Sequence, residues 1–253
     1  MLKIWIKKLL APPRLKALRR QFGLNQKIRI LDVGCGNDSC ALTRYWLNVQ
    51  EYHGVDREHW QGRELDYKRM DQLFFLDLEK SDLREIPDLF YDALIMSHVI
   101  EHLKCGEEVL FKLLPKLKTR GVIYIETPSE LTLRYPSAEG FLNFYDDPTH
   151  QRLYPIDNLN RLLSERNFTV LRSGYRRDWA RILLLSPLAL FLNLFWFLPV
   201  RRKILASGLW DLLGVAKFSL AQKNETPTPK STLETDTKRT NTEENSAVDL
   251  PLF

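Results

Sequence analysis

The chain has 253 residues, of which 44% are hydrophobic and 27% are charged. This composition supplies enough apolar surface for a sizeable core, and it excludes collagen-like, wholly disordered and polytopic membrane proteins. Three cysteines cannot form a complete set of internal disulfides, so we expect free thiols in a reducing, cytoplasmic compartment. The net charge of +5 is modest, but the basic residues gather before Asp32, the first acid. Such a basic segment suits an anionic partner or a solvated surface.

Residues 1–26 form this basic leader. The spacing of apolar residues over residues 1–10 predicts a short amphipathic helix, which Ala11-Pro12-Pro13 ends. Lysines interrupt its apolar run and no small-residue cleavage site follows, so the segment does not read as a secretory signal. The helix either packs on the folded domain or lies at a membrane interface.

Short β-rich segments alternate with helical patterns from residue 27 to residue 223. This alternation predicts βαβ units, an α/β fold and a mainly parallel sheet. The tail, residues 224–253, is polar and cannot offset its chain entropy, so we expect it to be disordered. The expected strands are 27–33, 52–55, 73–76, 93–97, 122–127, 169–173 and 215–221, and the expected helices are 39–47, 106–117 and 157–166.

Acidic residues and a glycine turn follow the first three expected strands. The first strand contains Asp32 and runs into Gly34-x-Gly36, where the backbone can approach a ligand without a Cβ in the way. Asp56 and Asp77 end the next two strands. One such aspartate would usually cap a strand or helix. Three of them beside a glycine turn fit the crevice in which open α/β sheets bind ligands.

In these features the chain resembles the class I S-adenosylmethionine-dependent methyltransferases, over roughly residues 27–223. The resemblance implies a Rossmann-like seven-stranded sheet and S-adenosyl-L-methionine as the cofactor. A dinucleotide site is less favoured, because Ser39 stands where the third glycine of Gly-x-Gly-x-x-Gly would be. The methyltransferase pattern also often has a third glycine, where this chain has Asp38. By resemblance, Asp32, Gly34 and Gly36 surround the methionine part, Asp56 binds the ribose, Asp77 and Leu78 hold adenine, and Ser97 and His98 line the outer side.

The segments that would face the acceptor carry two further resemblances. The stretch from Val99 to Leu103, Val-Ile-Glu-His-Leu, resembles a group that includes quinone-biosynthesis O-methyltransferases. Asp-Pro-Thr-His, ending at His150, resembles bacterial methyltransferases that often accompany polysaccharide or lipid-linked sugar pathways. A hydroxyl acceptor benefits from a base, and an imidazole titrates near neutrality, so we assign His150 as the catalytic base, with Glu101 and His102 as alternatives. The competing interpretations are helix capping and packing for Glu101 and His102, and turn ordering for His150.

A metal-dependent alternative rests on the same segments. His98, Glu101, His102 and His150 are similar in spacing to the Glu-x-x-Glu-His stretch and distant histidine that bind a divalent metal in small-RNA 2′-O-methyltransferases. His98 stands where that family has a glutamate, and one carboxylate is few for magnesium. We therefore assign no metal. An RNA-directed enzyme with a divalent ion stays an alternative, although no appended RNA-binding module is recognisable.

Residues 182–200 contain no charged side chain and are flanked by basic residues on both sides. A single membrane crossing would separate the sixth and seventh strands, which form an antiparallel pair in the family. We therefore expect residues 182–214 to be an apolar helical insertion that returns to the same side. A packed helix pair or a dimer interface is the alternative. The basic flanks favour an anionic membrane surface.

The sequence thus predicts a leader (1–26), a methyltransferase domain (27–223) and a tail (224–253). The predicted function is O-methylation of a lipid-linked saccharide or other amphipathic metabolite by a cytoplasmic enzyme that is peripheral to the membrane. The partners are a small-molecule or lipid-linked acceptor and an anionic membrane surface, and nucleic acid is disfavoured. A non-catalytic protein with the cofactor fold that acts as a membrane-bound partner is the remaining alternative.

Overall fold

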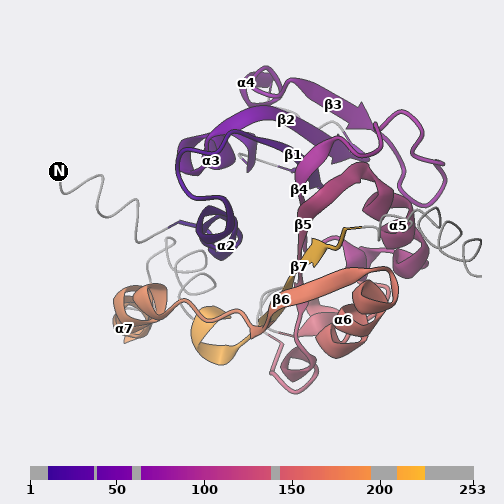
Figure 1. Cartoon of the computed structure of the whole chain (residues 1–253). Helices are drawn as coiled ribbons and strands as arrows, with labels where there is room; N and C mark the ends of the chain where they lie inside the picture. Colours follow the sequence, from indigo (N-terminus) through magenta and orange to yellow (C-terminus); the bar gives the residue numbers. More distant parts are fainter. Residues whose placement is uncertain (1–10, 37–38, 59–63, 138–142, 195–209, 226–253) are drawn as a thin grey trace, which may run out of the picture.

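A seven-stranded sheet forms the centre of the protein (Figure 1). The computed structural model describes residues 11–36, 39–58, 64–137, 143–194 and 210–225. The strand order is β3-β2-β1-β4-β5-β7-β6. The strands are β1 (Ile28–Val33), β2 (Val49–Asp56), β3 (Gln72–Phe75), β4 (Tyr91–Ser97), β5 (Leu117–Pro128), β6 (Phe168–Tyr175) and β7 (Ala216–Lys223).

The pairing confirms the α/β fold and the Rossmann-like sheet. Strands β1 to β5 pair in parallel, whereas β7 lies antiparallel between β5 and β6. Because parallel strands share one direction, the carboxyl ends of β1, β2, β3, β4 and β5 meet along a single edge. This edge therefore collects the residues that follow five different strands.

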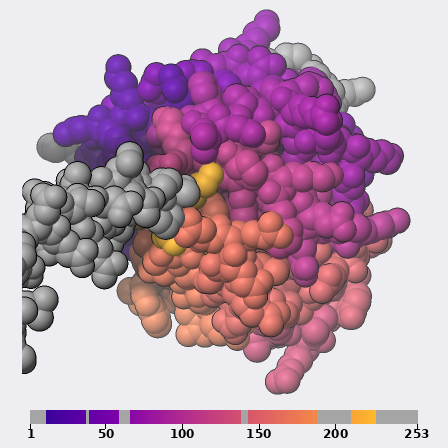
Figure 2. Space-filling model, turned by 45° about the vertical axis from the view of Figure 1, so that its right-hand side comes forward, coloured from indigo at the N-terminus to yellow at the C-terminus, as the bar shows by residue number. Residues whose placement is uncertain are grey.

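Side chains of the parallel strands alternate between two apolar cores. In β1, Ile28 and Ile30 face one core, whereas Leu31 and Val33 face the other. Helices α2 and α3 cover the first face, and α5 and α6 cover the second (Figure 1). Burial on both faces explains why these strands read as nearly continuous apolar runs. In Figure 2, residues 210–225, in yellow, reach the surface only over a small area.

The helices largely match the expected ones. The expected helix at 106–117 ends as an α-helix at Leu113, and a 3₁₀ turn that contains Pro115 follows it, because proline cannot continue the hydrogen-bond ladder. The α-helices are α2 (Pro13–Phe22), α3 (Ser39–Trp46), α4 (Glu64–Tyr67), α5 (Gly106–Leu113), α6 (Ile156–Glu165) and α7 (Trp179–Leu194), and the 3₁₀ turns are η1 (Ile100–His102), η2 (Leu114–Lys116), η3 (Glu130–Leu133) and η4 (Phe144–Asp146).

Helix α2 was not expected from the sequence. The sequence suggests Pro13 as part of a helix stop, but the residue occupies the first turn of α2, where a missing N–H costs nothing. Leu15 and Leu18 are fully buried in the core that α2 shares with β1. Part of the segment that we named the leader is therefore packed on the sheet.

The apolar stretch begins as helix α7, which contains Pro187. Its flanking strands, β6 and β7, form the expected antiparallel pair, so the chain must return to the sheet after the stretch. Within the described residues, no helix has the length and hydropathy needed to cross a bilayer. The expected leader helix (1–10), Asp38, the remainder of the insertion (195–209) and the tail from residue 226 lie outside the described residues.

The glycine turn after β1 gives a first prediction. A Cβ added at Gly34 would lie 2.3 Å from Cγ2 of Val99, and the residue has φ +68°. Gly36 also has a positive φ, +48°, but its Cβ would meet nothing closer than 3.8 Å. We expect Gly36→Ala to cost about 1–2 kcal/mol of unfolding free energy from backbone strain. Gly34→Ala should cost about 1–3 kcal/mol more, because it also overpacks.

Urea denaturation of both variants measures this difference. Equal losses in the two variants would show that Gly34 does not pack against Val99 as described.

Candidate active site

The turn after β1 is held against the end of β2. The backbone N–H groups of Gly34 and Cys35 donate to the carbonyl oxygen of Val55, at 2.8 and 3.2 Å. Both glycines of the turn have positive φ, which only glycine adopts without strain. The outer side of Gly36 is open, so the backbone there is accessible to a ligand.

Asp32 lies beneath this turn and not in the open crevice. It is 3% exposed, and its Oδ2 accepts hydrogen bonds from the hydroxyls of Ser39 and Tyr52. Burial raises the pKa of Asp32, and outweighs the nearby charge of Arg14 and the two hydroxyl donors, which lower it. In the protein without ligand, Asp32 thus fixes the start of α3 against β2.

Asp56 lies beside the glycine turn, as the sequence predicted. Its Oδ2 accepts from the backbone N–H of Gly36 at 3.0 Å, and its Oδ1 accepts from that of Arg57 at 2.8 Å. The carboxylate is only partly buried, so lone pairs remain for a ligand. The structure therefore brings Asp56, Gly34 and Gly36 together.

Asp77 and Leu78 follow β3 at the same edge of the sheet. Oδ1 of Asp77 accepts from the backbone N–H of Glu79 at 3.1 Å, and its other oxygen pairs with Lys80 at 3.4 Å. Leu78 is buried among the side chains of the core. The carboxylate of Asp77 is partly exposed beside this apolar side chain, an arrangement that suits a flat, polar-edged ring.

His98 does not simply line the crevice after Ser97, at the end of β4. It has φ +55°, a backbone conformation that is uncommon outside glycine. Nδ1 of its ring lies 3.0 Å from Oε1 of Glu101, and Nε2 lies 3.1 Å from Oε1 of Glu126. Burial would lower the pKa of His98, but the hydrogen bonds and charges of the two carboxylates raise it to about 9. The ring is therefore a cation that bridges two buried acids.

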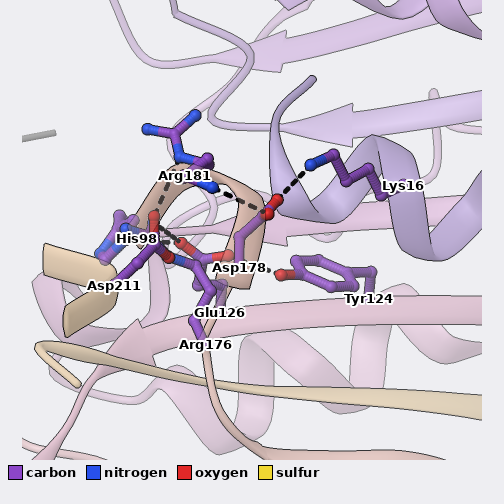
Figure 3. A network of polar contacts seen from close by, with 8 residues as sticks. All are labelled: Lys16, His98, Tyr124, Glu126, Arg176, Asp178, Arg181 and Asp211. Atoms are coloured by element: carbon purple, nitrogen blue, oxygen red, sulfur yellow. Dashed lines mark hydrogen bonds and ion pairs between the residues drawn. The ribbon is translucent and has the colours of Figure 1, made fainter. Parts of the chain in front are cut away.

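Glu126 connects His98 to a wider network of buried charges (Figure 3). Its oxygens also accept from Nη1 of Arg176 at 2.7 Å and from the hydroxyl of Tyr124 at 2.6 Å. Burial would raise the pKa of Glu126, but the charge of Arg176 and these donors hold it well below its usual range. Nε of Arg176 donates to Oδ1 of Asp211 at 3.0 Å, and Nε of Arg181 donates to Oδ2 of the same carboxylate at 2.9 Å.

This network connects the antiparallel end of the sheet, β7 and β6, to the site. It joins β5, the segment after β6, α7 and the turn before β7, and Lys16 of α2 pairs with Asp178 at its margin (Figure 3). Sequence reasoning missed it, because its members lie far apart along the chain. The available signal was a glutamate, Glu126, at the end of an otherwise apolar strand.

The three residues that we assigned to catalysis come together in one cavity. Glu101, His102 and His150 line a hollow of about 160 Å³. The rings of His102 and His150 lie 4.8 Å apart between centroids. The remaining lining residues follow β4, end or follow β5, or precede β7: His98, Pro128, Thr132, Asn143, Phe144, Asp147, Trp210 and Val215.

Hydrogen bonds fix the tautomers of both histidines in this cavity. Nδ1 of His150 lies 2.6 Å from the carbonyl oxygen of Phe144, which can only accept, so Nδ1 carries the proton. Thr149 gives its hydroxyl hydrogen to Asp147, so it accepts from Nδ1 of His102 at 2.8 Å. In each neutral ring, Nε2 is thus left with a free lone pair.

The cavity adjoins the glycine turn through Val99. This residue precedes η1, which carries Glu101 and His102, and it lies where a Cβ of Gly34 would be. A ligand on the turn and a ligand in the cavity would therefore be neighbours across one residue.

The comparisons with known proteins agree with this geometry. The family model described as methyltransferase domain matches residues 5–173. No curated protein matches the chain. A SAM-dependent methyltransferase from Archaeoglobus fulgidus has the same fold with 22% identity and a TM-score of 0.50, over 88% of this chain and 99% of that one.

A second solved structure is that of 1,6-didemethyltoxoflavin-N1-methyltransferase from Burkholderia thailandensis. It is 15% identical, with a TM-score of 0.54, and the match covers 88% of this chain and 81% of that one. That protein was solved with 1,6-didemethyltoxoflavin and S-adenosylhomocysteine bound. At such low identity, both likenesses show the fold alone.

The charge network gives a second prediction. Glu126→Gln removes the negative charge on which His98 and Arg176 converge, so it should lower the free energy of unfolding by about 3–5 kcal/mol. Glu130→Gln is the matched control, because Glu130 pairs with Lys217 at 2.7 Å near the surface, where a pair contributes at most about 1 kcal/mol. Urea denaturation compares the two. If Glu126→Gln costs no more than its control, the buried pairs are not coupled.

Proposed function

The chain belongs to the methyltransferase domain family and is a class I S-adenosylmethionine-dependent methyltransferase, and from this premise we propose that it methylates a hydroxyl of an amphipathic acceptor at a membrane surface. The acceptor class that we favour is a lipid-linked saccharide. Three observations support this: the residues at the cofactor edge, the polar cavity beside it and an exposed apolar helix face.

The residues at the edge of the sheet fit S-adenosylmethionine, the enzyme's cofactor, which supplies a methyl group on a sulfonium centre. The open backbone at Gly36 suits the methionine part, and the carboxylate of Asp56 suits the two ribose hydroxyls. Asp77 and the buried Leu78 suit adenine. Asp32 would act through the turn that it holds from below.

The cavity carries the proposal for the acceptor. Methyl transfer needs mainly an oriented nucleophile against an activated methyl group. Two imidazole lone pairs line the cavity beside a buried carboxylate, and the hydroxyls of a ligand could bond to the two imidazoles. In the absence of a bound ion, Nε2 of His150 would accept the hydroxyl proton, because its Nδ1 proton is already committed to Phe144.

Helix α7 supports the membrane surface. Trp179 and Leu183 are four residues apart on one helix face and are 65% and 73% exposed. Leu184 is 48% exposed beside them, whereas Ile182 faces inward. Figure 1 shows α7 at the edge of the molecule, away from the sheet. An outward apolar face with basic residues before and after the apolar stretch is typical of an interfacial helix.

The proposed ribose contact gives a third prediction. Asp56→Ala should weaken binding of S-adenosylhomocysteine about 10- to 100-fold for each ribose hydrogen bond that is lost, because a charge-assisted hydrogen bond contributes about 1.5–3 kcal/mol. Asp82→Ala is the control, since Asp82 also accepts a backbone N–H two residues ahead, at 3.1 Å, and is not among the residues assigned to the cofactor. Calorimetry measures both affinities. Parent-like binding by Asp56→Ala would remove Asp56 from the site.

Transfer of a labelled methyl group tests the acceptor class. Vesicles made from a lipid extract of the source cells are incubated with the enzyme and methyl-labelled S-adenosylmethionine. We expect label in the lipid fraction, released by mild acid as a methylated saccharide. Label confined to RNA, or to a water-soluble acceptor, would contradict the proposal.

A variant of α7 tests whether the membrane surface matters in the same assay. Leu183→Ser with Leu184→Ser should reduce lipid labelling and vesicle sedimentation, while affinity for S-adenosylhomocysteine stays unchanged. Leu24→Ser with Leu171→Ser, at 57% and 37% exposure elsewhere, is the control. Equal labelling by both double variants would exclude α7 as the contact with the membrane.

A further inference from the structure

Three side chains of types that commonly bind metal ions lie close together in the cavity. Glu101 and His102 come from η1, and His150 comes from the loop before α6. One potential ligand atom of each lies within 4.8 Å of the others. Two atoms bound to one tetrahedral ion at about 2.1 Å are about 3.4 Å apart, so a pair at the full separation would have to close by about 1.4 Å. Rotation of an imidazole ring supplies a movement of that size.

The two imidazoles already have the tautomers that a metal ligand needs. A histidine ligand usually donates its second ring N–H to a carbonyl, a carboxylate or water, which fixes the tautomer and the ring plane. His150 donates Nδ1–H to the Phe144 carbonyl, and His102 donates Nδ1–H to Thr149, whose hydroxyl is in turn bonded to Asp147. Both Nε2 atoms are thereby left as ligands.

Glu101 provides an independent observation. The residue is 0% exposed, and His98 occupies only one of its carboxylate oxygens, Oε1. Among the described residues, the other oxygen, Oε2, has no hydrogen-bond partner although it is buried. A buried carboxylate oxygen without a hydrogen bond lowers the stability of the fold. We therefore expect Oε2 of Glu101 to have a partner other than the described residues.

We propose that Glu101, His102 and His150 bind a divalent first-row transition metal ion. Two imidazoles and one carboxylate suit Zn²⁺, Co²⁺, Fe²⁺ or Mn²⁺, whereas Mg²⁺ and Ca²⁺ prefer oxygen ligands. Three protein ligands leave open positions, and the same residues line the cavity, so an acceptor oxygen can reach the ion.

The proposal deepens the proposed function, on which its catalytic role rests. An ion at this site would hold the acceptor hydroxyl and lower its pKa. The hydroxyl proton would then pass to solvent, the new C–O bond would form and the C–S bond of the sulfonium would break, so no oxidant or reductant is required. A metal-bound His150 has no lone pair left, so it would be a ligand and not the base in this state.

Direct metal binding tests the site. The protein is treated with chelator and dialysed, in a Cys105→Ser background that removes the exposed thiol, and is titrated with Co²⁺ while visible absorption is recorded. We expect one equivalent to bind with the spectrum of a nitrogen–oxygen site, and calorimetry with Zn²⁺ to give the same stoichiometry. Excess Mg²⁺ should not displace Co²⁺.

Variants locate the bound ion. His102→Ala and His150→Ala should each weaken Co²⁺ binding by more than 100-fold, and Thr149→Val, which removes only the orienting hydroxyl, by about 10- to 100-fold. Asp82→Asn, at an exposed carboxylate outside the cavity, should leave Co²⁺ binding unchanged. Both histidines are partly exposed, so the variants should fold, and circular dichroism checks this. Absence of binding, or binding that all four variants retain, would overturn the proposal.

The outcomes separate this proposal from the proposed function. Methyl transfer that survives chelation and is lost in His150→Ala, with no Co²⁺ binding, would overturn the metal site and leave His150 as the base. Co²⁺ binding that depends on His102 and His150, without label in any lipid, would support the metal site and leave the acceptor class refuted.

Discussion

The imidazolium of His98 between two buried carboxylates is the contact on which the site depends. Without that cation, Glu101 and Glu126 would be two acids in an apolar interior with only Arg176 to offset them. The cost of such unpaired charges would force one acid to take up a proton or the loop to move. His98 adopts a strained, positive φ. In this conformation its backbone N–H also donates to the carbonyl oxygen of Glu126.

This bridge sets the positions of groups on both sides of it. Toward the cavity, it holds one oxygen of Glu101, a residue that lines the cavity with His102 and His150, and the other oxygen stays buried without a hydrogen-bond partner among the described residues. Toward the sheet, Glu126 accepts a hydrogen bond from Arg176, the residue that follows β6, and so connects the bridge to the antiparallel strands. The glycine turn is coupled through Val99, because the turn and the start of η1 are packed too closely for a Cβ. The glycine turn and the cavity are thus connected through packed neighbouring residues.

The sequence was informative wherever local chemistry determines structure. The strands were predictable because burial on both faces demands apolar, β-branched runs, and Asp56 was predictable because it follows such a run at a fixed place in the fold. Helix α2 was missed because Pro13 serves equally as a stop and as a first helical residue. The network of Glu126, Arg176 and Asp211 was not predictable, because its spacing is set by the pairing of β5, β6 and β7 and not by the chain.

The residues that we assign to catalysis illustrate the same limit. Their residue types pointed to an acceptor site, but neither the tautomers of His102 and His150 nor the unpaired oxygen of Glu101 could be read from spacing. Likewise, the sequence placed His98 on the outer side of the cofactor, whereas both of its ring nitrogens bond to buried acids.

The charge of the His98 ring is the quantity that tests this account most directly. Nitrogen NMR of chelator-treated protein, with His98→Gln to assign the signal, follows both ring nitrogens between about pH 6 and pH 10. The account predicts that both are protonated at neutral pH and that the ring titrates near pH 9. A ring that is neutral at pH 7, or that titrates at the ordinary value of about 6.5, would contradict it.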